Sequence, residues 1–239
     1  MTELIDAVDI PFLEPDVIEQ KAHGLCERAF GRLPDGPVDL HALVYDFLYE
    51  QHGVAFYNDR PLGEDGEHNV LGMTYPLKNE IHVDGQLATS GHSGRYRFTV
   101  AHEIGHWVLH RPLFVEAADG DDEPRLITLQ RDVEAASTDS PDDYRPEEWQ
   151  ANYFAIHLLL NDRALDRAYR MRFGAPPRRF DAEAVTEFET MREFSRHLAI
   201  EEIDEQPSLA NYFRLSAEAT AIALEERGYV VDAVNRDES

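Results

Sequence analysis

The stretch FTVAHEIGHWVLH, residues 98–110, constrains the fold of this chain more than any other part of its sequence. Small or apolar residues cover most of the circumference of a helix with about 3.6 residues per turn. Such a helix is predicted to be buried on nearly all sides, yet it carries His102, Glu103 and His106. Burying these polar side chains is unfavourable unless each finds a partner, so a partner must lie beside the helix.

A metal ion would satisfy both histidines. Residues four positions apart lie on one helix face, one turn from each other, so His102 and His106 can bind one ion. Glu103 is offset by about 100° from His102, which places it beside a metal-bound water and predicts a general acid/base. This H-E-x-x-H helix is the zinc-hydrolase signature. The alternative is that both histidines belong to an ordinary core.

His110 continues the four-residue spacing but is excluded as the third ligand on a straight helix. It lies about 12 Å along the axis from His102, whereas metal–nitrogen bonds are about 2.0–2.1 Å long. We therefore expect His110 either to cap the C-terminus of the helix or to contact a metal-binding histidine from outside.

A third ligand is expected from the segment PEEWQANYFAIHLLL, residues 146–160, which begins like a helix. Glu148 and Asn152 fall on a stripe of small and polar residues that would allow close approach to the first helix. Glu148 is therefore the predicted ligand, and Asn152, one turn later, is expected to orient one of the histidines. Glu147 points about 100° away and is the weaker choice. The alternative is that both glutamates only favour the helix dipole.

The remaining pattern predicts helices at about 14–31 and 37–53, the second capped by Asp39 and ended by Gly53, and short strands at 54–57, 70–76 and 79–85. The strand around 81–83 precedes the histidine helix and is a candidate to pair with an extended substrate. The single Cys26 excludes an intrachain disulfide, and neither a secretory signal nor a membrane span is recognised. We therefore expect a cytoplasmic protein without a membrane partner.

The charge of the chain argues against general nucleic-acid binding. The 47 acidic and 22 basic residues give a formal net charge of −25, which repels a phosphate backbone. Six arginines gather in residues 163–179; DNA contact and pairing with the abundant acids are the two interpretations, and we favour the second. Residues 208–231 resemble helix, turn, helix, with Ser216 as N-cap and Gly228 as stop, but the second helix offers one arginine against three glutamates. This unit is expected to pack or to dock a partner.

The segments RFTVAHEIGHWVLH, 97–110, and EWQANYFA, 148–155, resemble the ImmA/IrrE family of metallo-endopeptidases. The resemblance covers roughly residues 15–165. It implies an α+β fold, with a zincin-like peptidase domain at 1–165, a small three-stranded sheet packed on the H-E-x-x-H helix and an acidic insertion at about 111–147. A C-terminal helical, helix-turn-helix-like region would follow at 166–239. The insertion is either a flap or a surface loop, and the second is our default interpretation.

By this resemblance His102, His106 and Glu148 hold one Zn²⁺ per chain, or Mn²⁺ or another divalent ion, and Glu103 is catalytic. The implied partner is a protein substrate, a helix-turn-helix repressor of the phage type, in a stress, DNA-damage or mobile-element response. Two alternatives stay open: a DNA-binding transcriptional regulator, and a catalytically silent protein that keeps the site to bind a partner. The oxyanion donor is not assigned; the sequence offers His82, His92, Tyr75, Tyr153 and His157 without ranking them.

Overall fold

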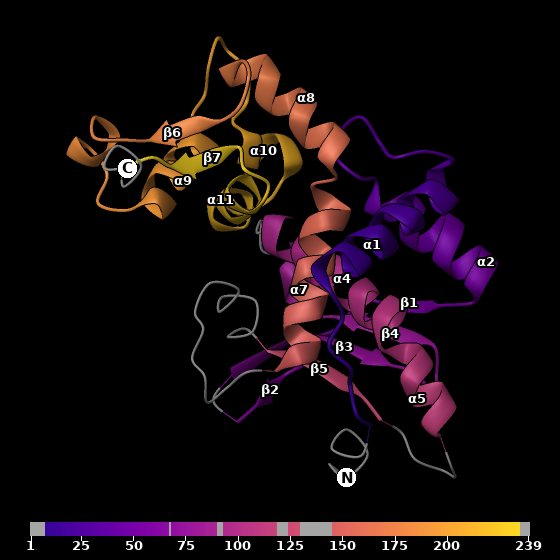
Figure 1. Ribbon diagram of the computed structural model, residues 1–239. Coiled ribbons are helices and arrows are strands. Elements are labelled where there is room, and N and C mark those ends of the chain that lie inside the picture. Colours follow the sequence, from indigo (N-terminus) through magenta and orange to yellow (C-terminus); the bar gives the residue numbers. More distant parts are fainter. Residues whose placement is uncertain (1–7, 67, 90–92, 119–123, 130–144, 235–239) are drawn as a thin grey trace. The chain divides into compact units, whose positions relative to one another are not determined.

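The computed structural model describes residues 8–66, 68–89, 93–118, 124–129 and 145–234 (Figure 1). The chain forms two compact units, and each is described by itself. The first comprises Met1–Leu33 and Val38–Leu159, and the second comprises Pro34–Pro37 and Leu160–Ser239. The first unit therefore contains every residue that the sequence proposes for the metal site.

The first unit begins with the two helices that the sequence predicts. Helix α1 (Pro15–Phe30) starts with proline and ends at Gly31, whose φ of 75° suits glycine. In the second predicted helix, Asp39 caps the first turn by accepting a hydrogen bond from the Ala42 amide at 3.1 Å. The next residues form a π-helix, η1 (Ala42–Tyr49), followed by α2 (Glu50–His52). The Asp39 cap is thus confirmed, while the π-helical turn was not predicted.

The sheet of the first unit has five strands among the described residues, so the prediction of three was wrong. They are β1 (Ala55–Tyr57), β2 (Glu64–Asp65), β3 (His68–Tyr75), β4 (Glu80–Val83) and β5 (Leu126–Leu129). The order is β1-β4-β3-β2, with β5 also paired to β3; β1 and β4 are parallel and the other pairs antiparallel. Strand β2 has only two residues, too few for a periodic signal.

Strand β5 also corrects the prediction of an acidic insertion over 111–147. The apolar run LITL lies between acidic stretches, and it pairs with β3 from Thr74↔Leu126 to Val70↔Leu129. Helix α5 (Arg111–Ala117) likewise belongs to the fold, with Phe114 buried. Of the predicted insertion, residues 119–123 and 130–144 lie outside the described residues.

The prediction that the strand around 81–83 receives a substrate strand was wrong. Ile81 lies opposite Phe56 of β1 on one side and Thr74 of β3 on the other. Both edges of β4 are therefore occupied. A strand paired on both sides has no free backbone groups with which to bind a substrate strand.

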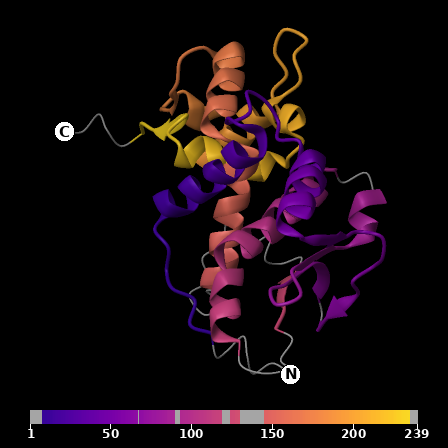
Figure 2. The same ribbon diagram turned by 90° about the vertical axis from the view of Figure 1, so that its right-hand side faces the viewer.

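Helix α4 (Ser93–Leu109) contains the H-E-x-x-H residues, and its predicted position near 95–110 is confirmed. It packs against β3, β4 and β5, and α7 (Pro146–Leu159) packs against α4. The short α3 (Gly85–Thr89) precedes α4, and α1 and α7 lie side by side (Figures 1 and 2). A Cβ at Gly105 would come within 3.2 Å of Ala151 and Phe154, so small residues allow α4 and α7 this approach.

The second unit is mainly helical. It contains α8 (Asp162–Phe173), β6 (Arg178–Phe180), η3 (Ala184–Thr186), α9 (Met191–Ile200), α10 (Leu209–Phe213), α11 (Ala217–Glu226) and β7 (Val230–Asp232). Strands β6 and β7 are parallel. The side chain of Ser216 accepts a hydrogen bond from the Ala219 amide, and Gly228 follows α11 with a φ of 68°. The predicted cap and stop are confirmed, although the predicted helix-turn-helix-like unit is not.

Arginines of the 163–179 cluster have partners within the second unit. Arg163 forms an ion pair with Asp35, and Arg170 donates to both carboxylate oxygens of Asp166 at 2.8 Å. Arg172 donates to the carbonyl of Pro207. These contacts favour pairing over DNA binding for the arginines concerned. Separately, none of the helices in the described ranges is both long and apolar enough to cross a membrane.

Candidate metal centre

Three side chains converge between α4 and α7. The two Nε2 atoms of His102 and His106 lie 2.9 Å apart. Glu148 places Oε2 at 3.2 Å from the first and Oε1 at 3.4 Å from the second. Atoms that bind one ion at about 2.0–2.2 Å are separated by roughly 3 to 3.5 Å, so the arrangement fits a divalent metal. This is one of the groups of potential metal ligands among the described residues.

The electrostatics of this cluster favour a bound cation. Burial alone would raise the pKa of Glu148, but His106 and His102 hold it well below its ordinary range. Burial would lower the pKa of His102, yet the neighbouring Glu148 carboxylate leaves it raised. A carboxylate anion is therefore maintained in a site where His102 and His106 are fully buried and Glu148 is 5% exposed. Arg145 supplies one positive charge, since its guanidinium lies 3.4 Å from Glu148 Oε1, and a cation bound by the three side chains would stabilise the anion further.

A partner fixes the outer nitrogen of each histidine. Asn152 Oδ1 lies 2.8 Å from His102 Nδ1, so this nitrogen donates and Nε2 keeps its lone pair for an ion. His106 Nδ1 lies 2.9 Å from His110 Nδ1, and His110 Nε2 lies 3.2 Å from Gln150 Oε1. Burial lowers the pKa of His110 to about 3, which keeps it neutral and able to accept a hydrogen bond from His106. His110 thus contacts His106 from outside, one of its two expected positions.

The chain of hydrogen bonds continues away from the cluster. Gln150 Nε2 donates to the carbonyl of Pro11 at 2.9 Å, so a single donor direction runs from His106 through His110 and Gln150 to the N-terminal segment. Gln150 was not predicted from the sequence as a partner of His110. It lies on the helix of Glu148, but no local pattern links it to His110.

Glu103 is fully buried, and the hydroxyls of Thr74 and Thr128 both lower the pKa of its carboxyl. Thr74 of β3 donates its hydroxyl to Glu103 Oε2 at 2.6 Å. Among the described residues Oε1 has no hydrogen-bond partner. Burial raises the pKa of Glu103, although His106 and His102 oppose this shift. A carboxylate with a raised pKa is suited to accept and later release a proton.

Gly72 makes room for this carboxylate. A Cβ at position 72 would lie 2.2 Å from Glu103 Oε1 and 2.7 Å from its Cδ. Thr74 follows two residues later, and alternate residues of a strand share a face, so β3 turns Gly72 and Thr74 together toward α4. Both were missed from the sequence. The available signal was a glycine inside a strand, which often marks a close approach.

The other predicted candidates lie elsewhere. Glu147 accepts from Arg145 at 3.0 Å. His157 is nine residues beyond Glu148, about 13.5 Å along α7 and half a turn away, so it cannot serve as the oxyanion donor. Tyr153 stacks on that histidine, with 4.4 Å between ring centroids. His82 pairs with Glu80, Tyr75 donates to Met73 Sδ, and His92 lies outside the described residues.

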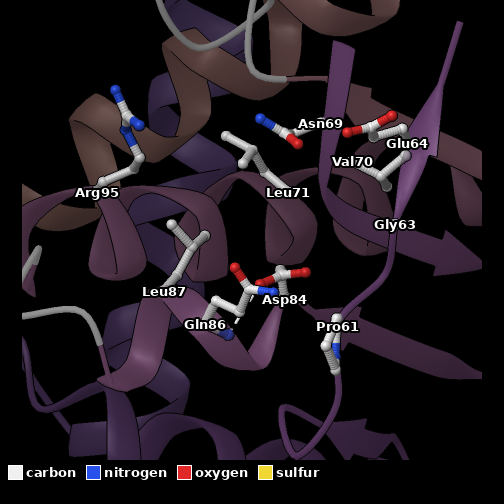
Figure 3. Close-up of a pocket in the computed structure, with 10 residues that line it drawn as sticks. All are labelled: Pro61, Gly63, Glu64, Asn69, Val70, Leu71, Asp84, Gln86, Leu87 and Arg95. Carbon is white, nitrogen blue, oxygen red and sulfur yellow. Dashed lines mark hydrogen bonds between the residues drawn. The ribbon is translucent and has the colours of Figure 1, made fainter. Parts of the chain in front are cut away.

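A cavity of about 410 Å³ lies beside β3 in the same unit (Figure 3). Arg95 and Leu87 stand at one end, and Gly63 and Glu64 at the other. Asp84 shapes its wall, since its two oxygens accept hydrogen bonds from the amides of Leu62 and Gln86. None of the three clustered ligands lines this cavity, which is therefore distinct from the candidate metal centre. The complete lining is Pro61, Gly63, Glu64, Asn69, Val70, Leu71, Asp84, Gln86, Leu87 and Arg95.

The site has two histidines and a glutamate placed to bind one ion, and a second glutamate between the histidines on the same helix. This combination is typical of metallopeptidases. Residues 86–225, more than half of the chain, match the peptidase M78 family, described as the IrrE N-terminal-like domain. The chain belongs to this family, which confirms the resemblance seen in the sequence. No curated protein matches it.

Proposed function

We propose that this protein is a zinc-dependent endopeptidase, with His102, His106 and Glu148 as metal ligands and Glu103 as the catalytic acid/base. The observation that carries the proposal is the convergence of these ligand atoms within 3.4 Å. Family membership supports the same activity. Two imidazoles and one carboxylate suit Zn²⁺ and also accept other divalent ions such as Mn²⁺.

The residues around the site have separate roles in this proposal. When bound, the ion supplies a Lewis acid that lowers the pKa of water and polarises the peptide carbonyl. Glu103 takes the proton of the attacking water on its carboxylate and passes it to the leaving amine. Thr74 donates a hydrogen bond to Oε2 and thereby fixes the orientation of the carboxylate. Asn152 and His110 hold the two imidazole rings so that each Nε2 faces the ion.

The proposed substrate is a helix-turn-helix transcriptional repressor of the phage type, whose cleavage would release genes of a stress, DNA-damage or mobile-element response. The resemblance to the ImmA/IrrE family supports this substrate. Co-expression with a repressor encoded beside this chain tests it. We expect site-specific cleavage with the wild type, none with Glu103→Gln, and full cleavage with Glu50→Gln, a control on the exposed end of α2.

The same experiment separates the alternatives. A Glu103→Gln protein that still relieves repression would indicate a silent partner-binding protein instead of a peptidase. A DNA-binding regulator would shift DNA in a mobility assay, and the shift would weaken as the salt concentration is raised. We expect no shift, because residues 200–239 carry ten acids and three arginines.

A further inference from the structure

A second group of metal-binding side chains lies on another face of α7. It includes His157 from this helix and Glu19 and His23 from α1. We propose that these three residues form a second site for a divalent metal ion, separate from the cluster of His102, His106 and Glu148. This inference is independent of the proposed peptidase function.

The distances allow one ion to bind all three side chains. Glu19 Oε1 lies 3.8 Å from His23 Nδ1, and Glu19 Oε2 lies 3.8 Å from His157 Nδ1. Atoms that bind one ion are separated by roughly 3 to 3.5 Å, so both pairs are slightly too wide as they stand. The potential ligand atoms of the group all lie within 4.8 Å of one another. Small side-chain rotations would bring them to bonding distance of one ion.

The surroundings combine a rigid side with an open one. His157 is 2% exposed and its ring packs on Tyr153, which fixes its direction. The side chains of Glu19 and His23 are 29% and 17% exposed, so an ion can enter and keep a water molecule as a further ligand. Glu19 and His23 stand four residues apart on α1 and therefore share one helix face. Two imidazoles with a carboxylate suit Zn²⁺ and similar divalent ions.

The chemistry of this second group points to a structural role. His23 has Ala22 and Gly24 as neighbours in the chain, so no carboxylate stands where Glu103 stands beside His102. An ion here would instead tie α1 to α7, two helices far apart in sequence that lie in contact. Because α7 also carries Glu148 and Asn152, the second ion would stabilise the helix that completes the first cluster.

Zinc stoichiometry of the metal-free full-length protein tests the proposal directly. By calorimetric titration with Zn²⁺ we expect two ions per wild-type chain and one in His23→Gln and in Glu19→Gln. The matched control is His41→Gln, which removes an exposed histidine from another helix and should retain two. One ion in the wild type that is lost in His102→Gln, or two ions in both His23→Gln and Glu19→Gln, would overturn the proposal. Far-UV circular dichroism shows that each variant is folded.

A variant without the first cluster separates the two proposals. His102→Gln should still bind one Zn²⁺ ion, and Zn²⁺ should still raise its melting temperature. The double variant His102→Gln with Glu19→Gln should lose both effects. If His102→Gln binds no zinc while the wild type binds one ion, the second site is wrong and the first stands. If His102→Gln binds as many ions as the wild type, the assignment of the first cluster fails instead.

Discussion

The two units bury polar side chains in different ways. In the second unit, buried polar side chains bond to the backbone of their own helix. Asn161 and Ser208 accept from amides at the starts of α8 and α10, and Ser195 and Thr220 donate to carbonyls one turn earlier. In the first unit, buried histidines and glutamates of α4 and α7 contact one another across the helix pair. Capping and turn bonds are local, whereas a convergent cluster brings together residues far apart in sequence.

This difference indicates what each unit's polar residues are for. Local bonds complete helix ends and stabilise the fold without any ligand. A buried group of carboxylates and imidazoles is unfavourable by itself and becomes favourable with a cation. Substitutions in the buried cluster of the first unit should therefore change metal binding and catalysis, and those at the helix ends of the second unit should change stability alone.

The largest effect is expected from Glu103→Gln. Amide replaces carboxylate at nearly the same size, so the protein should fold and keep its metal but lose its proton acceptor. We expect kcat/KM for a cleaved substrate to fall on the order of 10²–10⁴-fold. Metal content measured by elemental analysis should be unchanged. Undiminished cleavage would show that Glu103 is not the catalytic base. It would also contradict the view that the buried polar residues of the first unit serve catalysis.

A smaller effect is expected from Asn152→Ala. Loss of the hydrogen bond to His102 Nδ1 leaves the ring free to change orientation, and such a change typically weakens metal binding about 10–100-fold. Competition with a chromophoric chelator measures this affinity. The matched control is Asn161→Ala in the second unit, which removes a helix cap and should leave the affinity unchanged. Equal losses in both variants would contradict the comparison.

Part of the metal cluster could be predicted from the sequence, and part could not. The H-E-x-x-H spacing and the Glu148–Asn152 stripe identified the cluster because each is a repeat along one helix. Gly72, Thr74 and strand β5 were missed because their role depends on which strand lies under α4, and this is set by long-range pairing. The sequence likewise contained Glu19 and His23 at helical spacing, but nothing local placed His157 beside them.

The thiol of Cys26 is a buried titratable group of the first unit that belongs to neither of the two proposed metal sites. Burial, with a smaller contribution from Glu27, raises the pKa of the thiol from 9.0 to about 12. The unfolded chain therefore ionises first, and the free energy of unfolding should fall as the pH rises from about 9 to about 12. At pH 10 the loss is at most about 1.4 kcal/mol relative to neutral pH. Urea denaturation of Cys26→Ala at pH 7 and pH 10 should show a smaller decrease; an identical decrease would refute this cause.

The smallest effect is expected from Ser216→Ala at the start of α11. Its side chain accepts a hydrogen bond from the Ala219 amide, and losing such a cap lowers the free energy of unfolding by about 1 kcal/mol. Chemical denaturation measures this change, with Glu202→Ala at an exposed position of the second unit as a neutral control. Zinc affinity should be unaltered. A parallel loss of zinc would mean that the second unit's polar residues do more than stabilise helices.

The most direct test of the central claim is a crystal of the zinc-loaded protein measured at the zinc absorption edge. We expect an anomalous peak within about 2.0–2.2 Å of His102 Nε2, His106 Nε2 and a carboxylate oxygen of Glu148. A map with no zinc ion between the two imidazoles, and with Glu148 turned away from them, would contradict the account.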